Sequence, residues 1–230
     1  MIILLRTLAG LFLLQMVGVS MANNGHLSEE ELEAWFNSDI DLSEQVAKVN
    51  EGQLKFLDKP GKKPVYQAHN RITLLPMSDR DGWVNLSQCH TQLDAVHLAQ
   101  LVFPEYTLRN LTVTESRGIE IALVEEKSVQ LTNVGKDAKL CVSMQIQALT
   151  AQGEDRYMLT NGPFQRRFLD GYYPLNVLLL VEYGGSGLHP VMTHPVAQSG
   201  MRVTDDGQRM GIDARFEGVL RTQVLFKKNE

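Results

Sequence analysis

The chain has 230 residues, 43% of them hydrophobic and 21% charged, with 22 lysines and arginines against 27 aspartates and glutamates. This is the composition of an ordinary globular protein that is long enough to bury a sizeable core. The formal net charge of −5 argues against a nucleic-acid partner, because proteins that bind nucleic acids present a basic face.

Residues 1–22 have the pattern of a cleavable secretory signal peptide. Arg6 precedes an uncharged apolar stretch over 8–19, and Ser20-Met21-Ala22 forms a small-x-small cleavage pattern. The stretch is shorter than the roughly 20 apolar residues of a spanning helix. We therefore expect cleavage after residue 22, no transmembrane anchor after cleavage, and an extracytoplasmic location, either periplasmic or secreted.

Residues 23–52 predict a helical N-terminal segment with one or two short helices. Ser28 and Glu31 have the spacing of a capping box, and the helix that they start would run over 29–37. Asp41 can cap a second helix that ends near residue 50. Helices this short are marginal alone in water, so we expect the segment to dock on the body of the protein or on a partner.

Residues 53–230 show the pattern of many short strands. Strand-length apolar or alternating segments occur at 54–57, 65–75, 83–89, 99–103, 108–113, 119–125, 128–131, 140–149, 157–159, 166–169, 175–183, 188–193, 201–204, 210–216 and 219–226. Turn signals separate them, and no helical stretch of crossover length intervenes. We predict a mainly β fold, an antiparallel β-sandwich, built as one domain or as two immunoglobulin-like halves. The lack of a Pro/Ser-rich linker favours one domain.

The chain has two cysteines, Cys89 and Cys141. An oxidising compartment favours a disulfide between them. In both strands the alternation puts the cysteine on the side of the polar residues, opposite the main apolar stripe. The sequence therefore predicts a bridge on an outer or secondary face, unlike the buried disulfide between the sheets of antibody domains.

The most distinctive segment is 161–174, where arginines, an aspartate and aromatic residues gather around one turn. Such residue types dominate recognition surfaces. Together with two residues of an earlier strand they form our candidate surface for an envelope protein or an anionic or glycan-like ligand: Trp83, His90, Arg166, Arg167, Asp170, Tyr172 and Tyr173. The alternative is a plain hairpin at Asp170, closed by an Arg–Asp pair, whose aromatic residues pack on the sandwich.

No motif carries a recognisable chemistry. The six histidines lack neighbouring carboxylates or thiols at zinc-site spacing, so we predict no metal and no cofactor. Ser186 lies between glycines but lacks the spacing of a nucleophile elbow. Cys89 and His90 would project to opposite faces of a strand.

The leading hypothesis is an exported, non-enzymatic accessory or binding factor of the cell envelope. One alternative is a sandwich-fold hydrolase or carbohydrate-active enzyme, in which the fold brings together acids such as Asp94, Asp170 or Glu182. The other is a purely structural envelope component. Architecture alone does not decide between them.

Overall fold

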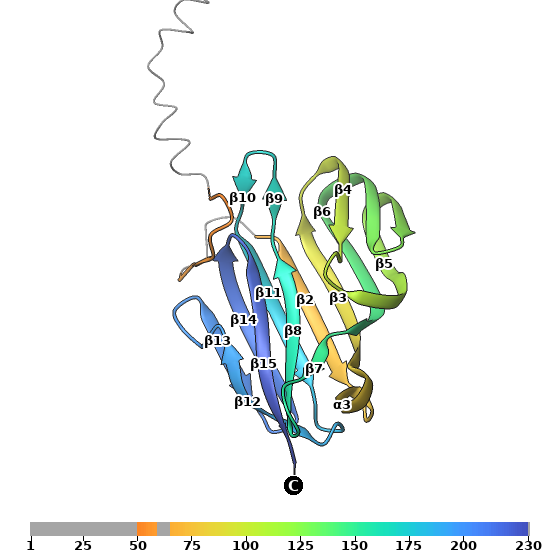
Figure 1. Cartoon of the computed structure of the whole chain (residues 1–230). Coiled ribbons are helices and arrows are strands. Elements are labelled where there is room, and N and C mark those ends of the chain that lie inside the picture. The colour runs from red at the N-terminus through yellow and green to blue at the C-terminus, as the bar shows by residue number, and fades with distance from the viewer. Residues whose placement is uncertain (1–49, 59–64, 230) are drawn as a thin grey trace, which may run out of the picture. The chain divides into compact units, whose positions relative to one another are not determined.

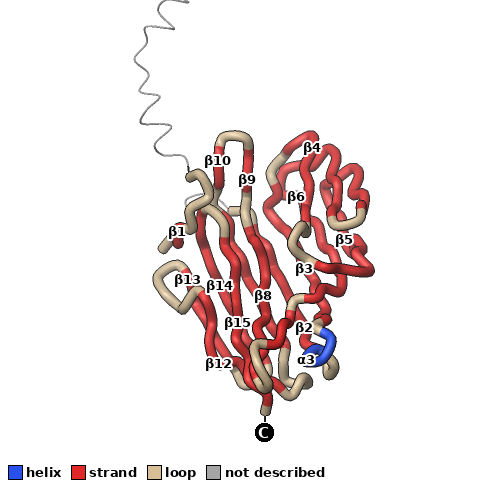
Figure 2. The backbone as a smooth tube through the Cα atoms, viewed as in Figure 1, coloured by secondary structure: helices blue, strands red, loops and turns tan. Residues whose placement is uncertain are grey.

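The structure of the protein is a computed structural model that describes residues 50–58 and 65–229. The predicted signal peptide and the predicted N-terminal helices lie outside the described residues. Within them nearly all regular structure is β-strand, which confirms the mainly β prediction (Figure 2). A four-residue helix, α3 (Ser78–Asp81), precedes Gly82, whose positive φ of 75° lets the chain turn into the next strand.

The larger sheet has nine strands. They are β1 (Lys55–Phe56), β2 (Gln67–Leu74), β3 (Trp83–Leu93), β4 (Val96–Val102), β5 (Thr107–Glu125), β6 (Ser128–Gln147), β11 (Leu175–Glu182), β13 (Met201–Asp205) and β14 (Arg209–Glu217). The order is β1-β14-β11-β2-β3-β6-β4, with β13 also paired to β14 and β5 also paired to β6 (Figure 1).

This sheet is mixed, because β2 and β11 at its centre run parallel, in register from Asn176 opposite Gln67 to Glu182 opposite Thr73. The prediction of a wholly antiparallel sheet is wrong at this pair. A parallel pair needs a long connection, usually a helix, and the sequence predicts no helix of that length between the strands. Here the connection from 75 to 174 consists of further strands instead.

Strands β5 and β6 form a long hairpin, where the sequence analysis predicted two shorter segments in each strand. The register between them shifts at three places in β5, between Arg109 and Thr112, between Val113 and Glu115, and between Arg117 and Ile119. Each bulge breaks the period-two alternation of side chains without ending the strand. The sequence pattern therefore stops at the bulge, whereas the pairing of β5 with β6 continues past it.

The remaining strands form two smaller sheets. They are β7 (Leu149–Ala151), β8 (Arg156–Phe164), β9 (Arg167–Phe168), β10 (Gly171–Tyr172), β12 (Leu188–His194) and β15 (Leu220–Lys228). The four-stranded sheet has the order β12-β15-β8-β7, and β9 and β10 form a two-stranded hairpin.

One hydrophobic cluster contains buried side chains from both the nine-stranded and the four-stranded sheet. In β11 the alternate residues Leu175, Val177, Leu179 and Val181 are buried, as the pleat of a half-buried strand dictates. Across the core, the ring of Phe226 in β15 packs edge-on against Tyr183, just after β11, with centroids 5.8 Å apart.

Cys89 and Cys141 form the predicted disulfide. They face each other directly in the β3–β6 register, with Cα atoms 4.1 Å apart. Two residues along, Ser87 faces Ser143 on the same side, whereas Val84, Leu86, Leu140, Val142, Met144 and Ile146 are buried on the other side. Cys141 is buried as well, although it lies on the side of the serines. The bridge therefore lies on the polar side of the sheet.

Candidate functional site

A cavity of about 420 Å³ lies between β3, β4 and β6 of the nine-stranded sheet and the segment that leads from β8 into β9. Figure 1 labels the strands β3, β4, β6 and β8, which contribute residues to this lining. Its walls are mostly apolar and include Ala99, Leu101, Phe103, Leu131, Leu140 and Phe164. We call it the His90 cavity, after the most unusual residue of its lining.

His90 is on the inner face of β3, in phase with the buried Val84 and Leu86, and only 4% of it is exposed. Its Nδ1 lies 2.6 Å from the hydroxyl of Tyr66, and the two rings stack with centroids 5.8 Å apart. Its Nε2 is buried and has no hydrogen-bond partner within the described ranges. Burial, with a smaller contribution from His69, lowers the pKa of His90 to about 4, so the imidazole is neutral at neutral pH.

Two more buried polar residues lie on the strands beside His90. Gln88, two residues earlier on the same face of β3, is 5% exposed and lines the cavity. Asn70 of β2 lies directly opposite Gln88, and its Oδ1 is also buried without a partner. Buried polar atoms are normally hydrogen-bonded, so two unpartnered atoms in neighbouring side chains are unusual.

A β-bulge follows His90. The register with β6 shifts between His90 and Leu93, and Gln92 has a positive φ of 58°. The extra residue rotates the end of β3, so that Leu93 and Asp94 also line the cavity. Bulges of this kind commonly re-aim side chains next to functional sites.

Arg166 and Asp94 form an ion pair at this end of the cavity. The guanidinium donates through Nε at 3.0 Å and through a terminal nitrogen at 2.6 Å to the two carboxylate oxygens, and through its other terminal nitrogen to the carbonyl of Pro174 at 3.3 Å. Burial raises the pKa of the nearby Tyr66 hydroxyl, while Arg166 opposes this shift and Asp94 adds to it. The pair thus presents a compensated charge to the cavity.

Tyr106 ties the wall of the cavity to the four-stranded sheet. Its hydroxyl donates to Oδ1 of Asn161 at 2.8 Å and accepts from the backbone N–H of Gly162 at 2.7 Å. Burial raises the pKa of Tyr106 to about 12, with the Gly162 N–H opposing the shift. The hydroxyl therefore stays protonated and holds β8 against the β4–β5 connection.

The β9–β10 hairpin carries the other candidate residues of segment 161–174. Arg167 is exposed beside the ring of Tyr172, 5.6 Å from its centroid, and also borders the cavity. Asp170, in the turn, accepts a hydrogen bond of 2.6 Å from the hydroxyl of Tyr173, which raises the pKa of that tyrosine. The expected Arg–Asp closure is absent from the hairpin, because Arg166 pairs with Asp94 instead.

Trp83 lies apart from these residues. Trp83 and His90 are seven positions apart in β3, an odd number, so their side chains lie on opposite faces of the strand. The guanidinium carbon of Arg109 lies 4.2 Å from the centroid of the Trp83 ring. The seven candidate residues therefore do not share one surface. His90, Arg166 and Arg167 border the cavity, whereas Asp170, Tyr172 and Tyr173 belong to the hairpin.

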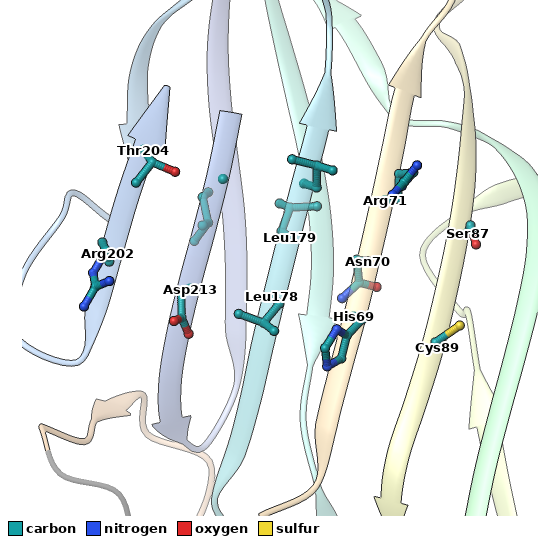
Figure 3. A pocket seen from close by; sticks show the side chains of 13 residues that line it. His69, Asn70, Arg71, Ser87, Cys89, Leu178, Leu179, Arg202, Thr204 and Asp213 are labelled. Carbon is teal, nitrogen blue, oxygen red and sulfur yellow. The ribbon is translucent and has the colours of Figure 1, made fainter. Parts of the chain in front are cut away.

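A second hollow, of about 550 Å³, lies on the polar face of the nine-stranded sheet. Figure 3 shows the side chains around it, among them Arg202 of β13, Leu178 of β11 and Cys89 of β3. Arg71 at its side is 3.5 Å from Glu182. We call it the outer hollow. Its lining is that of an exposed sheet face, and His90 and Gln88 are not part of it.

The acids named for a hydrolase are not brought together as a pair. Asp94 is held by Arg166, and Asp170 binds Tyr173. Glu182 accepts from Thr73 at the far end of β2, away from the end that pairs with the residues just before Asp94. Among the described residues no cluster of three metal-ligating side chains is found, and no helix there is long and apolar enough to cross a membrane.

Sequence analysis named His90 and Arg166 but missed the polar residues that surround them. Asn70 and Gln88 occupy positions of the apolar stripe in their strands, which is a signal that the alternation itself contained. Tyr66 and Tyr106 carried no such signal, because their partners lie 24 and 55 residues away.

Comparisons with known proteins add no family or function. Family models, curated protein sequences and solved structures were all compared with the chain, and none of them matched. The site is therefore defined by its own geometry.

Proposed function

We propose that this chain is an exported, non-enzymatic binding factor of the cell envelope, a β-sandwich that holds a small, largely apolar molecule in the His90 cavity. The proposal deepens the leading hypothesis from the sequence by assigning the binding to a place in the fold. The disulfide is compatible with an extracytoplasmic location.

The observation that carries the proposal is the cavity of about 420 Å³ itself, whose lining is mostly apolar and includes the buried side chains of His90 and Gln88. An apolar cavity of this size with a few convergent polar groups and a perturbed pKa is the usual form of a small-molecule site.

Binding is favoured over hydrolysis because the charged groups nearby are engaged. Asp94 has both oxygens bonded to Arg166, and glycoside hydrolysis needs two carboxyl groups that flank the substrate. His90 has one nitrogen bonded to Tyr66, and the described residues that line the cavity include no serine and no cysteine.

The test is the binding of the neutral fluorophore N-phenyl-1-naphthylamine to the purified mature protein. We expect saturable binding to one site, and weakening by about tenfold when Ala99→Phe fills part of the cavity. Leu178→Ser in the outer hollow is the matched control and should leave the affinity unchanged.

Three outcomes oppose the proposal. No saturable binding would remove the cavity as a ligand site, and sensitivity to Leu178→Ser alone would move the site to the outer hollow. A mature N-terminus that does not begin at Asn23 would contradict export by the predicted signal peptide.

A further inference from the structure

We propose that the free edge of β4 accepts an extended, apolar segment of a partner protein as an added strand, with a carboxylate at the end of that segment. The inference goes beyond the proposed function, because it concerns the backbone edge of β4 and not the interior of the cavity. It names the kind of partner that the protein would hold.

β4 offers unpaired backbone groups along one edge. Within the described residues it pairs with β6 alone, antiparallel and without a register shift up to Val102. Just after β4, the backbone N–H of Phe103 donates to the carbonyl of Lys127 at 2.8 Å. In an antiparallel pair, residues bonded to the partner strand alternate with residues whose backbone points away from it. Counted back from Phe103, the N–H and C=O groups of Leu98, Gln100 and Val102 therefore point away from β6.

The His90 cavity runs along this free edge. Its lining includes every residue of 98–104 and every residue of 162–168. Successive side chains of a strand point to opposite faces, so an unbroken run of lining residues means that the cavity borders the edge of β4 and not only one face. The two runs are antiparallel, since Gly162 bonds to Tyr106 and the other end is closed by the Arg166–Asp94 pair. The cavity is thus a groove with β4 as one wall and 162–168 as the other.

β4 lacks the features that protect other edge strands of the described chain. Such edges are commonly blocked by charges, prolines, bulges or short length. β1 and β7 have two and three residues, and β5 has three bulges. β12 contains Pro190 and a register shift, and β13 contains Arg202 and Asp205. β4 has seven residues without lysine, arginine, aspartate, glutamate or proline, and its Leu98 and Val102 are 77% and 47% exposed. It is therefore open to strand addition.

The groove fits a single strand and not a second copy of this chain. A second copy would bring a sheet several strands wide to the edge, and segment 162–168 stands in its way. That segment offers little pairing of its own, because Pro163 has no N–H and the N–H of Gly162 is bonded to Tyr106. An extended segment that pairs with β4 is the occupant that remains, and strand addition of this kind is a common mode of peptide recognition.

The charge of the lining indicates what the end of that segment carries. Two arginines and one aspartate give the lining a net charge of +1, since His90 is neutral. Arg166 is paired with Asp94, whereas Arg167 is exposed beside it. Asp94 lies just before the start of β4, and an antiparallel strand ends where its neighbour begins. A carboxylate at the C-terminal end of the added segment would therefore lie near Arg167.

The probe is the N-acetylated heptapeptide Ser-Val-Gln-Leu-Thr-Asn-Val with a free carboxylate. This is the sequence of 128–134, which pairs with the other edge of β4 within the fold. Binding to the purified mature protein is measured by isothermal titration calorimetry. Two isomeric peptides carry three backbone N-methyl groups each, on alternate residues, so that each lacks the donors of one edge. We expect one isomer to bind within about twofold of the parent peptide and the other to bind at least about tenfold more weakly.

Gln100→Pro removes an N–H of the free edge and no bond to β6, so we expect it to weaken the peptide at least about tenfold. Val124→Pro in β5 is the matched control. Val124 lies opposite Val129, whose backbone points toward β4, so the N–H of Val124 also points away from β6. This variant should leave peptide binding unchanged. A peptide with a C-terminal amide should bind about threefold more weakly, and Arg167→Ala should remove that difference.

The outcomes separate this inference from the proposed function. If N-phenyl-1-naphthylamine binds but the peptide does not, only the inference fails. If the peptide binds but the fluorophore does not, the proposed function fails and the inference stands. Equal binding of the two methylated isomers, or unchanged binding to Gln100→Pro, overturns strand addition. A wild-type dimer that Gln100→Pro converts to a monomer would show that the edge holds a second copy, which also overturns the inference.

A second measurement covers the case in which Gln100→Pro does not fold. Exchange of the backbone N–H groups of Gln100 and Val102 with deuterium is followed by NMR in the wild-type protein. Saturating peptide should slow both at least about tenfold, since strand pairing protects amides from exchange. Unchanged exchange rates at both residues would contradict pairing on this edge.

Discussion

The hydroxyl of Tyr66 lies 2.6 Å from Nδ1 of His90, and this contact joins β3 to the residue that leads into β2. Through it the imidazole is fixed in the core with its other nitrogen unpaired. The state of this one ring therefore links the stability of the fold to pH.

We predict that the free energy of unfolding falls as the pH drops from about 6.5 to about 4 because of His90. The pKa of His90 is about 4 in the folded protein and an ordinary 6.5 in the unfolded chain, so in this window the unfolded chain binds the extra proton. The full effect is roughly 3 kcal/mol. Urea unfolding at several pH values should show a shallower fall for His90→Leu than for the wild type. Parallel curves for the two proteins would contradict the prediction.

Tyr106→Phe should destabilise the protein by about 1–2 kcal/mol, because the hydroxyl serves both Asn161 and Gly162 in the core. Tyr157→Phe is the matched control, since Tyr157 is equally buried at 8% and its hydroxyl has no hydrogen bond within the described part of the chain. Thermal unfolding compares the two. Equal losses would show that the Tyr106 hydroxyl is not important for the junction.

Replacing Cys89 and Cys141 together by alanine should cost roughly 4 kcal/mol, because the bridge closes a loop with a sequence separation of 52. Urea unfolding of the oxidised wild type and of the double variant measures the difference. The native, non-reduced protein should also show no mass increase with a thiol reagent. Two thiol-reagent adducts on the native protein would contradict the prediction.

Arg166→Lys should cost about 1 kcal/mol, since lysine cannot form the two-pronged contact with Asp94. Arg209 makes a similar contact with Asp206, but its side chain is 59% exposed. Arg209→Lys should therefore cost at most a few tenths of a kcal/mol. Chemical denaturation would contradict the comparison if both variants lost the same stability.

Local features of the fold could be predicted from the sequence because they depend on neighbours in the chain. The alternation of apolar and polar residues in β3 predicts which face of the strand is buried and which is polar. It thereby also predicts the face on which the disulfide lies. A hairpin turn was likewise predicted at Asp170 and Gly171, and the structure has it one residue earlier, at Leu169 and Asp170, with Gly171 already paired to Phe168.

The candidate site could be predicted only in part, because it depends on which distant segments meet. Arg166 and Asp94 are 72 residues apart, and nothing in either segment names the other as its partner. Trp83 and His90 were assigned to one surface although their odd separation puts them on opposite faces of β3. The bulge at Gln92, which turns Asp94 toward the cavity, is set by pairing with β6 and has no local signal.

The parallel pair of β2 and β11 has a consequence for how the chain is made. Thr73 and Glu182, hydrogen-bonded at 2.9 Å across the two strands, are 109 residues apart. Closing so long a loop is entropically costly, and contacts of this kind slow folding. During synthesis β3 is available to β2 early, but the other edge of β2 stays open until β11 has emerged. A chain interrupted before residue 175 would expose that edge, which makes unfinished chains of this protein prone to aggregation.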